Sequence, residues 1–75
     1  MTRLVGFSAR QVITALQRLG FQVVSQKGSH IKLRKWITSQ KLTVIVPNHK
    51  ELKPGVMDSI LEMAELSPEE FKKHL

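Results

Sequence analysis

The alternation of apolar and polar side chains in Ser-His-Ile-Lys-Leu-Arg-Lys-Trp, residues 29–36, constrains the fold more than any other stretch. Successive side chains of a β-strand point to opposite faces of the sheet, so Ile31 and Leu33 share one face. The opposite face carries His30, Lys32, Arg34 and Trp36. A strand with one apolar face belongs to an antiparallel sheet that is covered on one side only. We therefore expect a sheet with one face under helices and the other open to water.

Two more strands are predicted on either side of this one. Residues 21–26 are rich in β-branched and aromatic side chains, and Lys27-Gly28 is typical of a turn. Residues 37–40 are expected to connect to a third strand, residues 41–46, which Pro47 ends. The inward residues of the third strand would be Leu42, Val44 and Val46. Connections this short predict an antiparallel meander of three strands.

Helices are predicted before and after the sheet. Ser8 and Gln11 form a capping box that starts a helix over residues 9–19, and Gly20 stops it. Pro54 fits the first position of a second helix. The apolar faces of the two helices comprise Val12, Ile13, Leu16 and Leu19, and then Val56, Met57, Ile60, Leu61 and Ala64. Ser67 to Glu70 is another capping box and predicts a short terminal helix. The order is α-β-β-β-α plus a short C-terminal helix, an α+β fold in one domain, residues 1–75.

Composition limits the chemistry that such a small domain can perform. The chain has 75 residues and no cysteine, so packing alone must hold it together and thiolate chemistry is excluded. Its formal net charge is +6 and its pI is about 10.2, which favours a polyanionic partner, nucleic acid first. No apolar run approaches the ~18 residues of a membrane span. We expect a cytoplasmic protein without a membrane partner, and any active site should lie on an open surface.

The acidic residues are poorly placed for metal chemistry. They are Glu51, Asp58, Glu62, Glu65, Glu69 and Glu70. None is paired with another acid or with a histidine at a convincing ligand spacing, which disfavours a two-metal nuclease. There is no Gly-rich phosphate loop, and Ser29-His30 lacks a third member of a catalytic triad. An enzyme built from this sequence would work with histidine and cations, without a metal or another cofactor.

RNA can be cleaved by attack of its 2′-hydroxyl on the adjacent phosphate, and this reaction needs little more than histidine and cations. An imidazole, with an ordinary pKa of about 6.5, can serve as the base or the acid, and cations stabilise the charge that develops on phosphorus. His30 is the candidate catalytic residue. The candidate RNA-binding residues around it are Lys27, Gly28, Ser29, Lys32 and Arg34. From the residues alone this is weak evidence, and an exposed position of His30 at the start of a solvated basic strand is favoured.

The other histidines and the single tryptophan leave alternatives open. His49, in Pro47-Asn48-His49-Lys50, would be a second acid or base if it lay at the same end of the sheet as His30; otherwise it is a polar loop residue. His74 is expected on the surface of the last helix. Trp36 could stack on a base, cover the end of the hairpin or dock a partner.

Several separated motifs occur together in a fixed order. They are Ser8-x-x-x-Val12-x-x-x-Leu16-x-x-Leu19-Gly20-Phe21, Gln26-Lys27-Gly28-Ser29-His30, Val44-x-Val46-Pro47-x-His49, Glu51-Leu52-Lys53-Pro54-Gly55 and Ile60-Leu61-x-x-Ala64-x-Leu66-Ser67-x-Glu69-x-Phe71. With them the chain closely resembles the HicA (YcfA-like) toxins of toxin–antitoxin pairs, over nearly its whole length.

This resemblance implies a fold like the double-stranded-RNA-binding domain and a metal-independent endoribonuclease that cleaves mRNA. It also implies a HicB-type antitoxin that blocks the active site, with a monomeric toxin alone and a hetero-oligomer in the complex. The family's catalytic histidine falls on His30, and the histidine of its Pro-x-His motif falls on His49. Two other classes remain: a non-catalytic module that binds double-stranded RNA, and a module that docks an acidic protein.

Overall fold

The first helix, α1 (Ala9–Arg18), begins at the predicted capping box in the computed structural model, which describes residues 4–75. Ser8 Oγ accepts a hydrogen bond from the Gln11 backbone N–H at 3.2 Å, and Gln11 Oε1 accepts one from the Ser8 N–H at 2.9 Å. These two bonds satisfy donors that the first turn of a helix otherwise leaves free. The helix ends one residue earlier than predicted, before Gly20, whose φ is +101°.

The three strands form the predicted antiparallel meander, with β2 in the middle of the order β1-β2-β3. They are β1 (Gln22–Lys27), β2 (His30–Ile37) and β3 (Gln40–Pro47). Each turn contains only two residues, Gly28-Ser29 and Thr38-Ser39, so the connection predicted over residues 37–40 is shorter than expected. Pro47 is the last residue of β3 rather than its stop. A proline is accepted there because β3 is an edge strand and needs no hydrogen bond on its outer side.

Two further helices complete the order, α2 (Pro54–Ala64) and α3 (Pro68–Lys72). The predicted second capping box is present, with Ser67 Oγ accepting from the Glu70 N–H at 3.1 Å. Hydrogen bonds from the backbone and side chain of Ser67, aided by the positive charges of Lys73 and Lys35, hold the pKa of the Glu70 carboxyl below its usual range. The carboxylate therefore stays charged and keeps its place at the start of α3 into mild acid.

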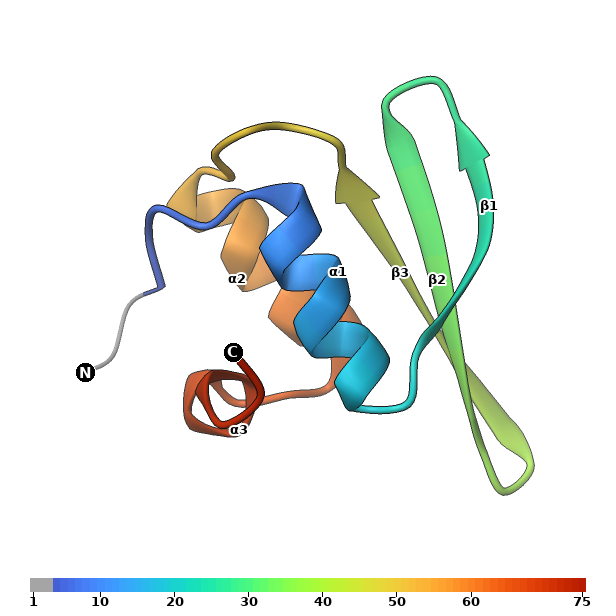
Figure 1. The fold of residues 1–75 in the computed structure, drawn as a ribbon. Coiled ribbons are helices and arrows are strands. Elements are labelled where there is room, and N and C mark those ends of the chain that lie inside the picture. Colours follow the sequence, from blue (N-terminus) through green and yellow to red (C-terminus); the bar gives the residue numbers. More distant parts are fainter. Residues whose placement is uncertain (1–3) are drawn as a thin grey trace.

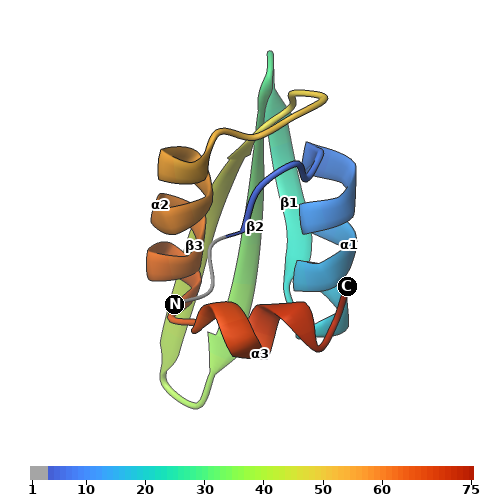
Figure 2. The same ribbon diagram turned by 90° about the vertical axis from the view of Figure 1, so that its left-hand side faces the viewer.

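Helices and sheet form two layers, as Figures 1 and 2 show. α1 and α2 lie side by side over one face of the sheet, α1 towards β1 and α2 towards β3, and α3 crosses them on the side away from the sheet. The predicted inward side chains of the sheet are all buried: Ile31, Leu33, Leu42, Val44 and Val46. The α+β fold with helices on one face is therefore confirmed, and the opposite face of the sheet remains open.

β1 departs from the burial that its apolar residues suggest. All six of its residues are exposed, including Val23 and Val24, and a bulge interrupts its pairing with β2 between Val23 and Ser25. An edge strand with a bulge presents both of its valines to solvent because neither helix reaches far enough over it. Phe21, just before the strand, is buried and supplies the core contact of this edge.

The turn between β2 and β3 carries backbone strain at Thr38, whose φ is +50°. A β-branched residue pays ~1–2 kcal/mol in this left-handed region, whereas glycine adopts it freely at an entropic cost of ~0.5–1 kcal/mol. We expect Thr38→Gly to raise the free energy of unfolding by about 0.5–1 kcal/mol in urea denaturation followed by circular dichroism. Ser39→Gly, at the neighbouring turn position, is the control and should not stabilise. Equal or lower stability of Thr38→Gly would contradict the strain.

Candidate nucleic-acid interface

The open face of the sheet collects the basic residues of β2. His30 heads the strand, with Lys27 of β1 and Pro47 of β3 as its paired neighbours. The pairing of β2 with β3 runs without interruption from His30–Pro47 to Ile37–Gln40, so alternate residues of β2 stay on one face. Lys32 and Arg34 therefore lie on the same face as the exposed His30, and both are half-buried. Arg34 Nε donates to Thr43 Oγ1 of β3 at 3.4 Å.

The turn beside His30 depends on Gly28. Its φ is +60°, and Ser29 does not have a positive φ, as in the type II′ turns that join twisted strands. A Cβ at Gly28 would meet no atom within 4 Å, so glycine is required for the backbone conformation and not for lack of room. This open, side-chain-free surface lies next to His30 and permits close approach of a ligand.

His49 lies at the same end of the sheet as His30. The backbone N–H of Asn48 donates to the carbonyl of Ser29 at 2.6 Å, which joins the residues next to the two histidines. The carbonyl of His49 accepts from the Ala9 N–H at 3.0 Å, so its backbone also ties the loop to the start of α1. The imidazole itself belongs to an exposed residue. His30 and His49 therefore lie at the same end of the sheet.

A shallow hollow of about 440 Å³ at this end adds one cation that the sequence reasoning missed. It is lined by Ser8, Arg10, Asn48, His49 and Lys50; His30 lies outside this lining. Arg10 sits in the first turn of α1, which contains no acid. A positive charge there opposes the helix dipole. That unfavourable placement was the signal by which the sequence could have singled out Arg10.

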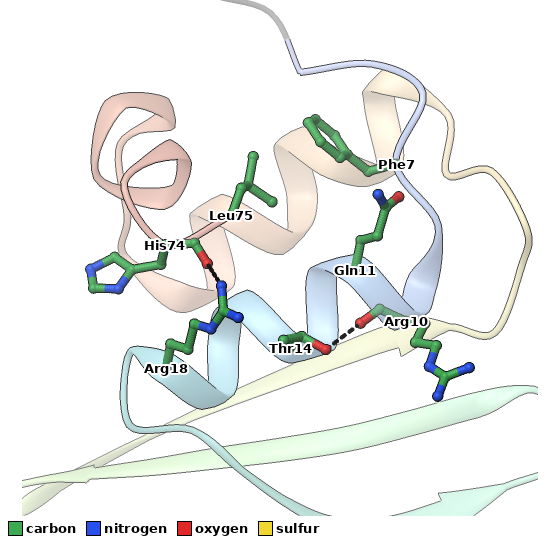
Figure 3. Close-up of a pocket in the computed structure, with 7 residues that line it drawn as sticks. All are labelled: Phe7, Arg10, Gln11, Thr14, Arg18, His74 and Leu75. Carbon is green, nitrogen blue, oxygen red and sulfur yellow. Dashed lines mark hydrogen bonds between the residues drawn. The ribbon is translucent and has the colours of Figure 1, made fainter.

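A second hollow, of about 370 Å³, lies between α1 and the C-terminus and contains none of the predicted site residues. Figure 3 shows its lining, in which Arg18 Nη1 donates to the carbonyl of His74 at 3.0 Å. The imidazole of His74 points away from the hollow, and the side chain of Arg10 extends away from it towards the sheet. The bond from Arg18 ties the last turn of α1 to the chain end, whereas Ser8 and Arg10, at the other end of α1, share a hollow with His49.

Charge is divided unequally along the sequence and therefore across the fold. Residues 1–50 contain nine Lys and Arg and no acid, whereas residues 51–75 contain all six acids and three lysines. The first part builds α1 and the sheet, and the second builds α2 and α3. Every charged residue of α1 and the sheet is therefore a cation, and all the acids lie in α2, α3 or the segments beside them.

Lys35 does not join the basic residues that neighbour it in sequence. It falls on the helix-covered side, where its Nζ lies 5.8 Å from the centroid of the Phe21 ring. Strand alternation separates it from Lys32 and Arg34, and the aromatic face stabilises its charge. The basic run of residues 27–35 therefore contributes Lys27, Lys32 and Arg34 to the open face, and Lys35 to the margin of the core.

Two wider features bear on what this surface is. Within residues 4–75, no three His, Cys, Asp or Glu side chains are grouped so that they could hold a metal ion. None of the helices in the same part of the chain is long and apolar enough to cross a membrane.

Fold and surface together define a small α+β domain with one helix-covered sheet face and one open, basic face. The family model for the HicA toxin of bacterial toxin–antitoxin systems matches residues 9–66. The chain therefore belongs to the HicA toxin family, and its expected partner is an antitoxin. No curated protein matches the chain.

Proposed function

We propose that this toxin is a metal-independent endoribonuclease that cleaves mRNA with His30 as a catalytic residue. The observation that carries the proposal is the position of His30 at the start of β2. It lies on the open face, paired with Lys27 and directly after the Gly28-Ser29 turn. Membership of a toxin family supports it, because a toxin needs an essential target, and so does the absence of acids from residues 1–50. RNA is a polyanion that such a surface attracts.

The proposed reaction is an attack of RNA on itself. A base removes the proton of a 2′-hydroxyl, the 2′-oxygen forms a bond to the adjacent phosphorus, and the bond from phosphorus to the 5′-oxygen breaks. An acid gives that oxygen its proton, so the products carry a 2′,3′-cyclic phosphate and a 5′-hydroxyl. His30 performs one of the two proton transfers, and His49, at the same end of the sheet, is the candidate for the other.

The neighbouring residues have binding roles in this scheme. Lys27, Lys32 and Arg34 hold phosphates and stabilise the charge of the transition state. Gly28 leaves space for the backbone of the RNA, and Ser29 donates a hydrogen bond from its hydroxyl. Arg10, which the structure places beside His49, joins this set.

The antitoxin is proposed to be of the HicB type and to cover the open face near His30. Acidic side chains of the antitoxin would meet Lys32 or Arg34, since complementary charge speeds and orients association. The toxin alone would be a monomer in the cytoplasm, and the inhibited form a hetero-oligomer.

Cleavage of a long mRNA by the purified toxin in EDTA tests the proposal. Fragments ending in a 2′,3′-cyclic phosphate are expected, with no need for a divalent cation. If the RNA is bound but stays intact, even with ribosomes added, the protein would be a non-catalytic RNA-binding module rather than an enzyme. If the protein does not bind RNA at physiological salt, it would instead be a module that docks an acidic protein.

The basic face also predicts a salt dependence that can be assigned residue by residue. In a His30→Ala background, which prevents cleavage, Lys32→Ala should weaken the binding of all single-stranded RNAs about equally. The slope of log affinity against log salt should fall by about 0.7 for the lost phosphate contact. Lys72→Ala, an exposed lysine on α3, is the control and should leave the slope unchanged. Equal effects of the two variants would place the RNA elsewhere.

A further inference from the structure

Trp36 is a large aromatic side chain that the fold leaves in water. It is 67% exposed, although it is the only tryptophan of the chain. It therefore does not cover the end of the hairpin, which was one of the roles open to it. Its paired neighbour in β3 is Lys41, whose Nζ lies 5.7 Å from the centroid of the indole ring.

The position of Trp36 relates it directly to His30. Both belong to the same face of β2, because the pairing with β3 is uninterrupted between them. Six residues separate them, or about 20 Å at ~3.3 Å per residue. Lys32 and Arg34 lie between them on that face. We call these four residues, His30, Lys32, Arg34 and Trp36, the β2 track.

We propose that the β2 track binds a single strand of RNA, with a base stacked on Trp36 and phosphates on the cations between Trp36 and His30. This inference rests on the proposed function and adds to it the form of the substrate and a binding residue distant from the chemistry. An exposed aromatic ring among cations is the usual means of holding single-stranded nucleic acid, since every base has a face to stack. An open sheet face that carries such rings is one of the established platforms for RNA.

The dimensions of the track set the length of RNA that uses it. At ~3.4 Å per nucleotide of a stacked strand, 20 Å corresponds to about six nucleotides, and to fewer in an extended strand. A base pair inside a duplex hides both of its faces in the stack, so a blunt duplex cannot engage Trp36 in this way. The track therefore selects single-stranded regions of an mRNA.

The indole of Trp36 reports its own contact, because it is the only tryptophan. Full-length toxin carrying His30→Ala is titrated with single-stranded oligonucleotides of two to ten nucleotides while tryptophan fluorescence is followed. We expect quenching that develops as the length rises to about four to six nucleotides. A blunt RNA duplex should not quench. Equal quenching by the duplex would overturn the proposal, because the indole would then sense the RNA backbone rather than a stacked base.

Variants distinguish stacking from other contacts. In the same His30→Ala background, Trp36→Ala should lower the affinity for a ten-nucleotide strand by roughly 5- to 150-fold, the effect of losing one stacked base. Trp36→Phe should recover part of the affinity. Ile37→Ala, a neighbouring apolar residue that is 42% exposed and belongs to the other face of β2, is the control and should not change it. Unchanged affinity of Trp36→Ala, or a loss of antitoxin binding alone, would overturn the proposal.

The test separates this inference from the proposed function. If the wild-type toxin cleaves RNA and Trp36→Ala binds RNA normally, the stacking proposal is wrong and the proposed enzymatic function stands. If RNA stacks on Trp36 but the wild-type toxin does not cleave it, the β2 track proposal stands and the proposed enzymatic function is wrong.

Discussion

Replacement of His30 by alanine is expected to reduce RNA cleavage by roughly 10²–10⁴-fold, the contribution of a positioned acid or base. His30 is exposed at the start of β2, so the change in the free energy of unfolding should stay within about 0.5 kcal/mol. Cleavage of a labelled mRNA in EDTA measures the first effect, and urea denaturation measures the second. Antitoxin binding should persist, which shows that the variant surface is intact.

His74→Ala is the matched control, because it removes an imidazole at the other end of α1 from the proposed site, and it should leave the rate unchanged. Full activity of a folded His30→Ala protein would remove His30 from the mechanism. His49→Ala divides the remaining possibilities. If the two histidines act as base and acid, the wild-type rate has a bell-shaped pH dependence and each single variant loses one limb of it.

Replacement of Phe71 by alanine is expected to lower the free energy of unfolding by about 3–5 kcal/mol. Phe71 is fully buried, and its ring meets that of Phe7 edge-to-face with 6.4 Å between centroids. A chain of this length has only about 4–11 kcal/mol of stability in total. The variant should therefore be largely unfolded at 37 °C or melt more than about 12 °C lower.

Urea denaturation followed by circular dichroism measures this loss. Leu75→Ala truncates an exposed apolar residue close to Phe71 in sequence and should cost little. A loss of less than about 1 kcal/mol for Phe71→Ala would mean that α3 is not needed to close the core. The point is informative because α3 lies outside residues 9–66, the segment that the family model matches.

Most of the fold could be predicted from local patterns. The capping boxes at Ser8 and Ser67 are bonds between residues three apart, so the sequence specifies them completely. The alternation around His30 follows from the two-residue period of a strand, which does not depend on the rest of the protein. Strand ends were less certain by a residue or two, because pairing with a neighbouring strand decides them. β2 and β3 each extend one residue further towards the turn at 38–39 than predicted, and β1 extends to Lys27, whereas β2 begins at His30 rather than Ser29.

The candidate site could be predicted only where it is local. His30, its basic neighbours and the side of the sheet they occupy were visible in the sequence. The approach of His49 and Arg10 was not, because it depends on the hydrogen bonds that join the loop after β3 to Ser29 and Ala9. Such contacts link residues far apart in the chain.

Local sequence patterns are enough to predict the order of elements, the apolar face of each and the resemblance to the HicA family. The reason is that backbone sterics, capping and side-chain period act over a few residues. The packing of the elements decided which cations share a surface, since Lys35 turns to Phe21 while Arg10 lines a hollow with His49. It also decided that Trp36 remains in water, because no element within residues 4–75 packs over the open face of the sheet.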